Sequence, residues 1–171
     1  LFRSLSLGGD KIGVVEVSGP IMESEKIVKH LERFTKDDNV KGIVVRVNSP
    51  GGAVAPSQEI FEAVRRAKEK KPLAVSMGST AASGGYYIAV GADKIFANSG
   101  SVTGSIGVVT QLFSVNRVLE KVEVDVHTMT TGPYKDAGSP FREWSARDEA
   151  YFGQLIDDIH EFGNLEASHL A

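Results

Sequence analysis

One short stretch, LAVSMGSTAASGGYY, runs from Leu73 to Tyr87 and is expected to change from strand to helix. Its first five residues are mostly apolar and suit a buried strand, and a run of small residues follows them. A serine, Ser83, stands at the expected turn and is followed by Gly84. Small neighbours let another backbone approach the hydroxyl group, and the first N–H groups of a helix are free to bind developing negative charge. The stretch therefore predicts a strand–turn–helix unit with a reactive serine at its turn.

We expect strands and helices to alternate on both sides of this stretch. In the first half we expect strands at 12–17, 42–47, 73–77 and 94–97, and helices at 23–35, 57–70 and about 84–90. In the second half we expect strands at 108–111 and 123–130 and a short helix at 116–121. A last helix is expected to start at Ser145, because Ser145 to Asp148 has capping-box spacing, and to bury Tyr151, Phe152, Leu155, Ile156, Ile159 and Phe162. The alternation predicts an α/β fold.

Two further motifs follow predicted strands. The first is NSPGG at 48–52, and the second is YKDAGSP at 134–140, which contains Lys135. A serine hydroxyl is a weak nucleophile until a base removes its proton, and an amine is a base only when neutral. Because a free lysine has a pKa of about 10.4, a lysine base needs an apolar surrounding. Asp136 would oppose this if it faced the amine, so we expect it to point elsewhere.

The order of these motifs resembles the signal peptide peptidase A family, membrane-associated serine proteases of the Clp-peptidase/crotonase superfamily. The resemblance extends from about Lys11 to about His160 and rests on NSPGG, AASGGYYIA, TGSIGV and YKDAGSP. It implies a superhelix of repeated ββα units. It also implies the site residues: Ser83 as nucleophile, Lys135 as general base, Gly52 and Gly84 as oxyanion-hole N–H donors, and Ser105 as a support for the lysine. No metal or other cofactor is implied.

Histidine offers an alternative base. His127 shares one face of the expected strand with Glu123 and Asp125, and the three could form a metal site or part of a triad. A solvated strand face is the interpretation that we favour. No histidine occurs between Gly84 and Val109, where a Clp-type triad would need one, and this favours lysine. Two other function classes stay open: a crotonase-like enzyme acting on acyl thioesters, and a non-catalytic assembly module.

Composition is consistent with a peptidase and sets the expected domain limits. The 171 residues carry a net charge of −3 and no cysteine, so we expect no nucleic-acid partner, no disulfide and no thiolate metal site. We expect a linker at 1–10, a peptidase domain at 11–160 and an atypical tail at 161–171. The tail is expected to result from truncation or to consist of residues added for expression.

The first residue is Leu1, not methionine, so we expect a soluble fragment of a longer protein with a membrane anchor. By resemblance, the catalytic part lies outside the cytoplasm, forms a ring-like homo-oligomer, with an octamer as one option, and cleaves peptides. Lys135 could serve Ser83 of its own chain or of a neighbour.

Overall fold

The computed structural model describes residues 2–7 and 9–168, with side chains for residues 9–161. The chain divides into two compact units. The first unit comprises Leu1–Gly107 together with Leu165–Ala171, and the second comprises Val108–Asn164. Each unit is described by itself.

The first unit is built on a six-stranded sheet with the order β1-β2-β3-β4-β5, and β6 pairs with β4 beyond the end of β5. The strands are β1 (Phe2–Leu7), β2 (Asp10–Ser18), β3 (Val40–Ser49), β4 (Leu73–Ala82), β5 (Lys94–Phe96) and β6 (Val102–Gly104). All neighbours pair in parallel except β1 and β2, which are antiparallel. Parallel strands need crossover connections, and α1 (Glu25–Lys36) and α2 (Val54–Lys68) provide them. The predicted α/β fold is confirmed.

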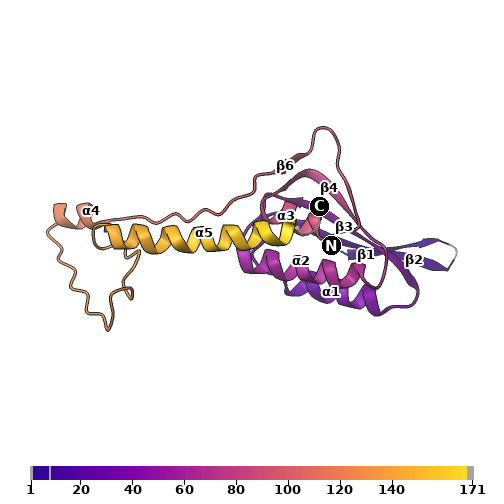
Figure 1. Ribbon diagram of the computed structural model, residues 1–171, viewed down its shortest axis with the longest axis horizontal. Helices are drawn as coiled ribbons and strands as arrows, with labels where there is room; N and C mark the ends of the chain where they lie inside the picture. The colour runs from indigo at the N-terminus through magenta and orange to yellow at the C-terminus, as the bar shows by residue number, and fades with distance from the viewer. Residues whose placement is uncertain (1, 8, 169–171) are drawn as a thin grey trace. The chain divides into compact units, whose positions relative to one another are not determined.

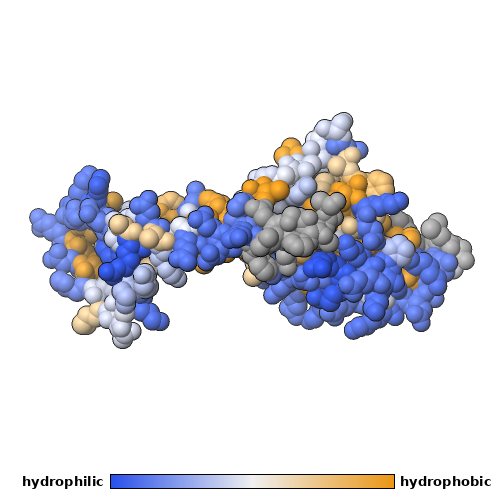
Figure 2. Space-filling model, in the orientation of Figure 1, coloured by the Kyte–Doolittle hydropathy of each residue, from blue (hydrophilic) through white to orange (hydrophobic). Residues whose placement is uncertain are grey.

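The core lies between the sheet and these two helices, which cover the same side of the sheet in Figure 1. Val45, Val47 and Val75 of the central strands are fully buried. The buried side chains of α2 include Ile60, Phe61, Val64 and Ala67. The outward face of α1 and α2 is hydrophilic in Figure 2, as expected of amphipathic helices.

The register between β3 and β4 breaks just before the serine turn. Val47 pairs with Met77, but Ser49 pairs with Ala81, so β3 advances two residues while β4 advances four. The additional residues on β4 form a bulge, and the strand continues through the small residues to Ala82 instead of ending at Met77 as predicted. The helix α3 (Gly84–Val90) follows at once. Ser83 therefore lies between the end of a central strand and the start of a helix.

Several expected elements are wrong. The predicted linker at 1–10 contains β1, which pairs along its whole length with β2. No strand forms at 108–111 or at 123–130, although the structure describes both ranges. The alternating valines indicated one apolar face, but a strand also needs a neighbour to accept its hydrogen bonds, and Val124 and Val126 stay 49% and 44% exposed.

The helices of the second unit were predicted correctly in position. They are α4 (Asn116–Lys121) and α5 (Ala146–Ser168), and the tail predicted at 161–171 continues α5 as far as Ser168. The expected burial along α5 is wrong: Tyr151 and Leu155 are exposed, and Phe152, Ile156 and Ile159 are half-buried. The side chain of Phe162 and the whole of residues 169–171 lie outside what the structure describes. Among the described residues, no helix combines the length and apolar character needed to cross a membrane.

Candidate active site

Ser83 has a backbone conformation that serine seldom adopts. Its φ is 50° and its ψ is −123°, at the junction of β4 and α3. Its N–H donates to the carbonyl of Gly104 at 2.8 Å, and its carbonyl accepts from the N–H of Tyr87 at 2.9 Å. Both of its peptide groups are thus fixed, and the half-buried side chain projects from a sharp strand-to-helix turn.

The NSPGG loop lies directly against this turn. A Cβ atom added to Gly51 would lie 2.8 Å from both the Gly84 nitrogen and the Ser83 Cβ, and Gly51 has a φ of 96°. Only glycine fits both the space and the backbone angle. The loop itself is held by the buried side chain of Ser49, whose Oγ accepts from the Gly51 N–H at 3.0 Å.

Gly52 pairs with Ile21 in an isolated parallel bridge. The two hydrogen bonds of this bridge use the carbonyl of Gly51 and the N–H of Ala53, at 2.9 and 2.7 Å. The N–H of Gly52 takes no part in them. Gly84 is the first residue of α3, so its N–H has no partner within the helix. The two glycines predicted as oxyanion donors therefore lie in adjoining segments. The N–H of Gly52 is not used by the bridge to Ile21, and the N–H of Gly84 is not used within α3.

Gly84 is also packed too tightly for any side chain. A Cβ atom there would lie 2.3 Å from Oγ of Ser57, a buried residue of α2. The Ser57 hydroxyl donates to the carbonyl of Ala53 at 2.8 Å, which ties the start of α2 to the loop. Behind the turn, the rings of Tyr87 and Phe61 stack with centroids 4.4 Å apart. Tyr87 therefore packs against α2.

Ser105 follows the strand that holds Ser83. β6 pairs with the end of β4 up to Gly104, and Ser105 has a φ of 54°. Positive φ alone is no sign of function, because Glu123, in the turn after α4, has it too. What distinguishes Ser105 is its place, one residue beyond the carbonyl that accepts the Ser83 N–H.

Lys135 belongs to the second unit and is exposed there. Its loop is a series of tight turns, in which the N–H groups of Lys135, Ala137 and Ser139 donate to residues three positions earlier at 3.0–3.3 Å. The ring of Tyr134 lies 5.3 Å from that of Tyr151 on α5.

Arg142 anchors this loop to α5 through two carboxylates. Its Nε donates to Asp136 Oδ2 at 2.8 Å, and its two terminal nitrogens donate to Asp148 at 2.6 and 2.7 Å. The expectation that Asp136 points away from the lysine is consistent with this contact, since its carboxylate is held by Arg142. Asp148 also accepts from the backbone N–H of Ser145, whose Oγ accepts from the Asp148 N–H, so the predicted capping box is confirmed.

The hydrogen bonds from Arg142 and Ser145 hold the pKa of the Asp148 carboxyl well below its usual range. The hydrogen bonds that Arg142 donates to Asp148 and Asp136 raise the pKa of its guanidinium. Asp148 and Arg142 are therefore both charged at neutral pH.

Four of the five predicted site residues lie in the first unit: Gly52, Ser83, Gly84 and Ser105. The structure brings the glycine loop, the serine turn and the end of β6 together. Lys135 lies in the second unit, and its pairing with Ser83 is taken up as a proposal below. Within residues 9–161, no three histidine or acidic side chains gather as metal ligands would, and this includes His127 with its two acidic neighbours.

Sequence reasoning missed Gly51 and Arg142. The motif pointed to the second glycine of the pair, although the first one contacts the serine turn. A signal for Gly51 was present, because two consecutive glycines after a strand often mark a close approach of two backbones. Arg142 gave no such signal, since the contacts that define its role come from residues on both sides of it in the chain.

Comparison with known families agrees with this arrangement. The model of peptidase family S49 matches residues 65–162, and that of the Clp protease family matches residues 13–103. The chain belongs to peptidase family S49. It is a peptidase domain of the serine class, with a Clp-like α/β fold.

Several curated relatives carry protease names. A putative protease of Synechocystis sp. is 40% identical over 88% of this chain and 54% of its own length. A putative signal peptide peptidase of Enterococcus faecium is 40% identical over 84% of this chain and 42% of its own length. The chloroplastic serine protease SPPA of Arabidopsis thaliana is 30% identical over 77% and 21%. The chain thus spans about half, or less, of the length of the relatives it matches.

A solved structure shares the fold. A mutant of the 1510-N membrane-bound stomatin-specific protease, in complex with a substrate peptide, aligns with a TM-score of 0.51. The alignment covers 64% of this chain and 51% of that one at 24% identity, and it shows the fold alone.

Proposed function

We propose that the protein is a serine endopeptidase in which Ser83 attacks the peptide carbonyl and Lys135 accepts the serine proton. The observation that supports this most directly is the strained Ser83 turn against the NSPGG loop. Strained backbone of this kind persists where the surrounding structure fixes it, and it concentrates at active sites. A serine in such a turn presents its hydroxyl group clear of the backbone.

The N–H groups of Gly52 and Gly84 would stabilise the oxyanion. Neither group is used by the local bridge or helix, and the two loops that bear them adjoin. Donors of this kind, preorganised where negative charge develops, lower the barrier of acyl transfer. Ser105, next to the strand that fixes Ser83, would hydrogen-bond the lysine amine and orient it.

Lys135 would act as the base once its amine is shielded from water and neutral. It is exposed in its own unit, so we propose that a neighbouring chain in a ring-like homo-oligomer provides the covering surface. Arg142 supports this role, because it engages the carboxylate of Asp136 that would otherwise favour the protonated amine.

The proposed substrates are remnant signal peptides and other short apolar or unfolded segments. The signal peptide peptidase name of the Enterococcus faecium relative favours this class. By the same argument we propose that the full-length protein is associated with a membrane, with this domain outside the cytoplasm.

Labelling with a serine-directed fluorophosphonate tests the nucleophile. We expect the reagent to form a covalent bond to Oγ of Ser83, with loss of fluoride, and the labelled peptide to contain Ser83. Ser83→Ala should lose labelling and at least ~10³-fold of peptide hydrolysis, since nothing else in the proposed site replaces the nucleophile. Ser79→Ala, on the same strand, is the matched control. Hydrolysis retained in a pure Ser83→Ala preparation would reject the assignment.

A further inference from the structure

One side chain from the neighbouring strand, that of Asn48, contacts both Gly78 and Thr80 of the bulge that precedes Ser83. The Oδ1 atom of Asn48 accepts a hydrogen bond from the Thr80 N–H at 3.2 Å. On the other side of the bulge, the Ser101 hydroxyl donates to the carbonyl of Gly78 at 2.7 Å. The bulge is thus held from both flanking segments.

Gly78 makes room for this contact. A Cβ atom on Gly78 would lie 2.7 Å from Asn48 Oδ1 and 2.8 Å from Asn48 Cβ and Cγ. The side chain of Asn48 therefore occupies the place that a side chain at 78 would need. The backbone of Asn48 is itself fixed, because its carbonyl accepts from the Gly19 N–H at 3.0 Å.

The contact lies where the register between β3 and β4 changes. Before it, Val47 pairs with Met77, and after it, Ser49 pairs with Ala81. Two residues of β4 are gained there, and an N–H in such a bulge loses its ladder partner. Asn48 Oδ1 supplies that partner for Thr80, three residues before Ser83.

We propose that Asn48 is a positioning residue for the nucleophile: its side-chain carbonyl sets the register of β4, and so fixes where Ser83 stands relative to Gly51 and Gly52. The inference rests on the proposed role of Ser83. Asn48 contacts neither the reacting atoms nor substrate in this account. A side-chain acceptor at 48 is what the role requires, so a change at 48 should affect the chemical step more than substrate binding. Misplacement of a reacting group by about 1 Å can cost ~10²-fold in rate.

The test uses three variants of the full-length protein. Asn48→Asp keeps an acceptor of the same shape, whereas Asn48→Leu keeps the volume and Asn48→Ala removes it, and neither of these two keeps an acceptor. We expect Asn48→Leu and Asn48→Ala to lower kcat, and the rate of fluorophosphonate labelling, by at least ~10-fold with little change in KM. Asn48→Asp should stay within about threefold of wild type on this argument. Asn39→Leu is the control, because the amide nitrogen of Asn39 donates to a neighbouring turn residue, Asp37.

Amide hydrogen exchange gives a second readout that does not depend on catalysis. Loss of the acceptor should speed exchange at Thr80 and Ala81 in Asn48→Ala but not in Asn48→Asp. If Asn48→Leu does not fold, Asn48→Ala decides the matter. Labelling and exchange at wild-type rates in a folded Asn48→Ala would overturn the inference. Wild-type protein that fails to label at Ser83 would overturn the proposed nucleophile instead, and exchange would then still report whether Asn48 holds the bulge.

Discussion

Strain and hydrogen bonding balance one another at Ser83. A non-glycine residue with a φ of 50° and a ψ of −123° carries a cost of about 1–3 kcal/mol. The hydrogen bonds to Gly104 and from Tyr87 fix the peptide groups on both sides, and the packing of Gly51 against the turn leaves no room to relax. The strained residue is therefore stabilised by its neighbours, as its proposed role as nucleophile would require.

A prediction at the residue scale concerns Lys135, the proposed base. Only a neutral amine accepts the serine proton, so activity should rise with pH towards an alkaline limb. Lys135→Arg should lose at least ~10²-fold of activity, because a guanidinium does not deprotonate in the working range. The measurement is a pH profile of kcat/KM on a short apolar peptide.

Lys121→Arg is the matched control for this experiment, since Lys121 ends α4 in the same unit. A profile set by a group titrating near pH 6.5, and lost in His127→Gln, would make the histidine the base and contradict the prediction.

At the scale of elements, the start of α5 fixes the lysine loop. Arg142 binds Asp136 on the loop and Asp148 on the helix, and the Gly138 N–H donates to Asp148 at 3.4 Å. The side chain of Asp148 is only 2% exposed, whereas those of Arg142 and Asp136 are 34% and 24% exposed. Loop and helix therefore share one charged cluster.

Acid should loosen this cluster. The pKa of Asp148 is lowered in the folded chain, chiefly by Arg142. Its contribution to stability is therefore complete above the unfolded pKa of about 3.9 and is lost as the pH falls towards the folded value. Trp144, the single tryptophan, stacks on Phe152 of α5 with centroids 5.6 Å apart and reports on this unit. We expect its emission to shift to the red below about pH 4.

Asp148→Asn should show the shifted emission already at neutral pH and a smaller change on acidification. Asp157→Asn, a change at an exposed position of the same helix, should behave like wild type. Identical acid profiles for wild type and Asp148→Asn would show that the cluster does not stabilise the loop.

How far the sequence predicts these elements depends on where their partners lie. The strands at 12–17, 42–47 and 73–77 were predicted correctly because each has an apolar run and a neighbouring strand in the same unit. The segment 123–130 has an equally clear alternation but no such neighbour, and it forms no strand. The serine and glycine motifs were found from their residue types. The bulge at Gly78 and the contact made by Asn48 were not predicted. Register depends on how two strands pair, so it cannot be inferred from the sequence of either strand alone.

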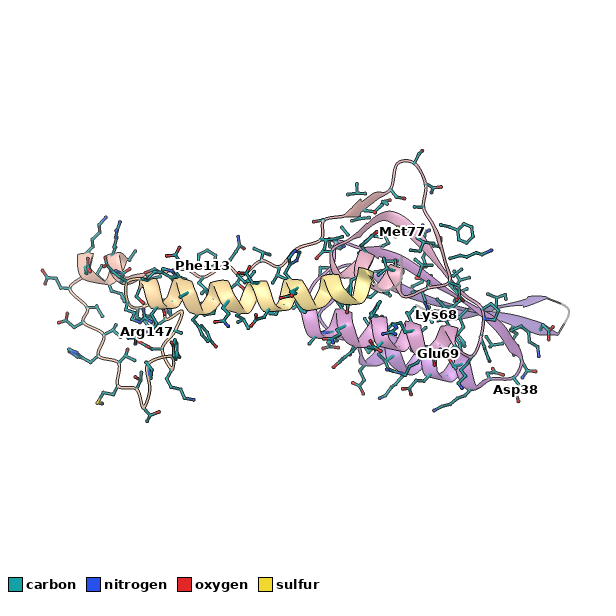
Figure 3. The ribbon with its side chains drawn as sticks, viewed as in Figure 1. Asp38, Lys68, Glu69, Met77, Phe113 and Arg147 are labelled. Atoms are coloured by element: carbon teal, nitrogen blue, oxygen red, sulfur yellow. The ribbon has the colours of Figure 1, made fainter. Side chains whose placement is uncertain are left out.

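At the scale of the whole molecule, the second unit leaves large apolar side chains uncovered. Val109, Phe113 and Met129 are 81%, 79% and 98% exposed, and Phe113 is labelled in Figure 3. Exposed apolar surface of this extent is typical of a region that binds another protein surface. This is the same unit that contains Lys135, whose proposed role needs a dry surrounding. A neighbouring chain would cover the exposed apolar side chains and would also exclude water from Lys135.

Mixing two inactive variants tests whether the site is shared between chains. Ser83→Ala lacks the nucleophile and Lys135→Ala lacks the base, so each should be inactive alone. If Lys135 serves a neighbour, some interfaces in a mixed oligomer unite an intact serine with an intact lysine, and part of the wild-type activity should return after subunit exchange. Exchange is followed by energy transfer between chains labelled with two dyes, which separates failed mixing from failed complementation. A mixture of Ser83→Ala with the double variant Ser83→Ala/Lys135→Ala is the control and should stay inactive, because no serine is present. Complete exchange without recovery of activity in the first mixture would place the working serine and lysine in one chain. The exposed apolar residues of the second unit would then need an explanation other than the exclusion of water from Lys135.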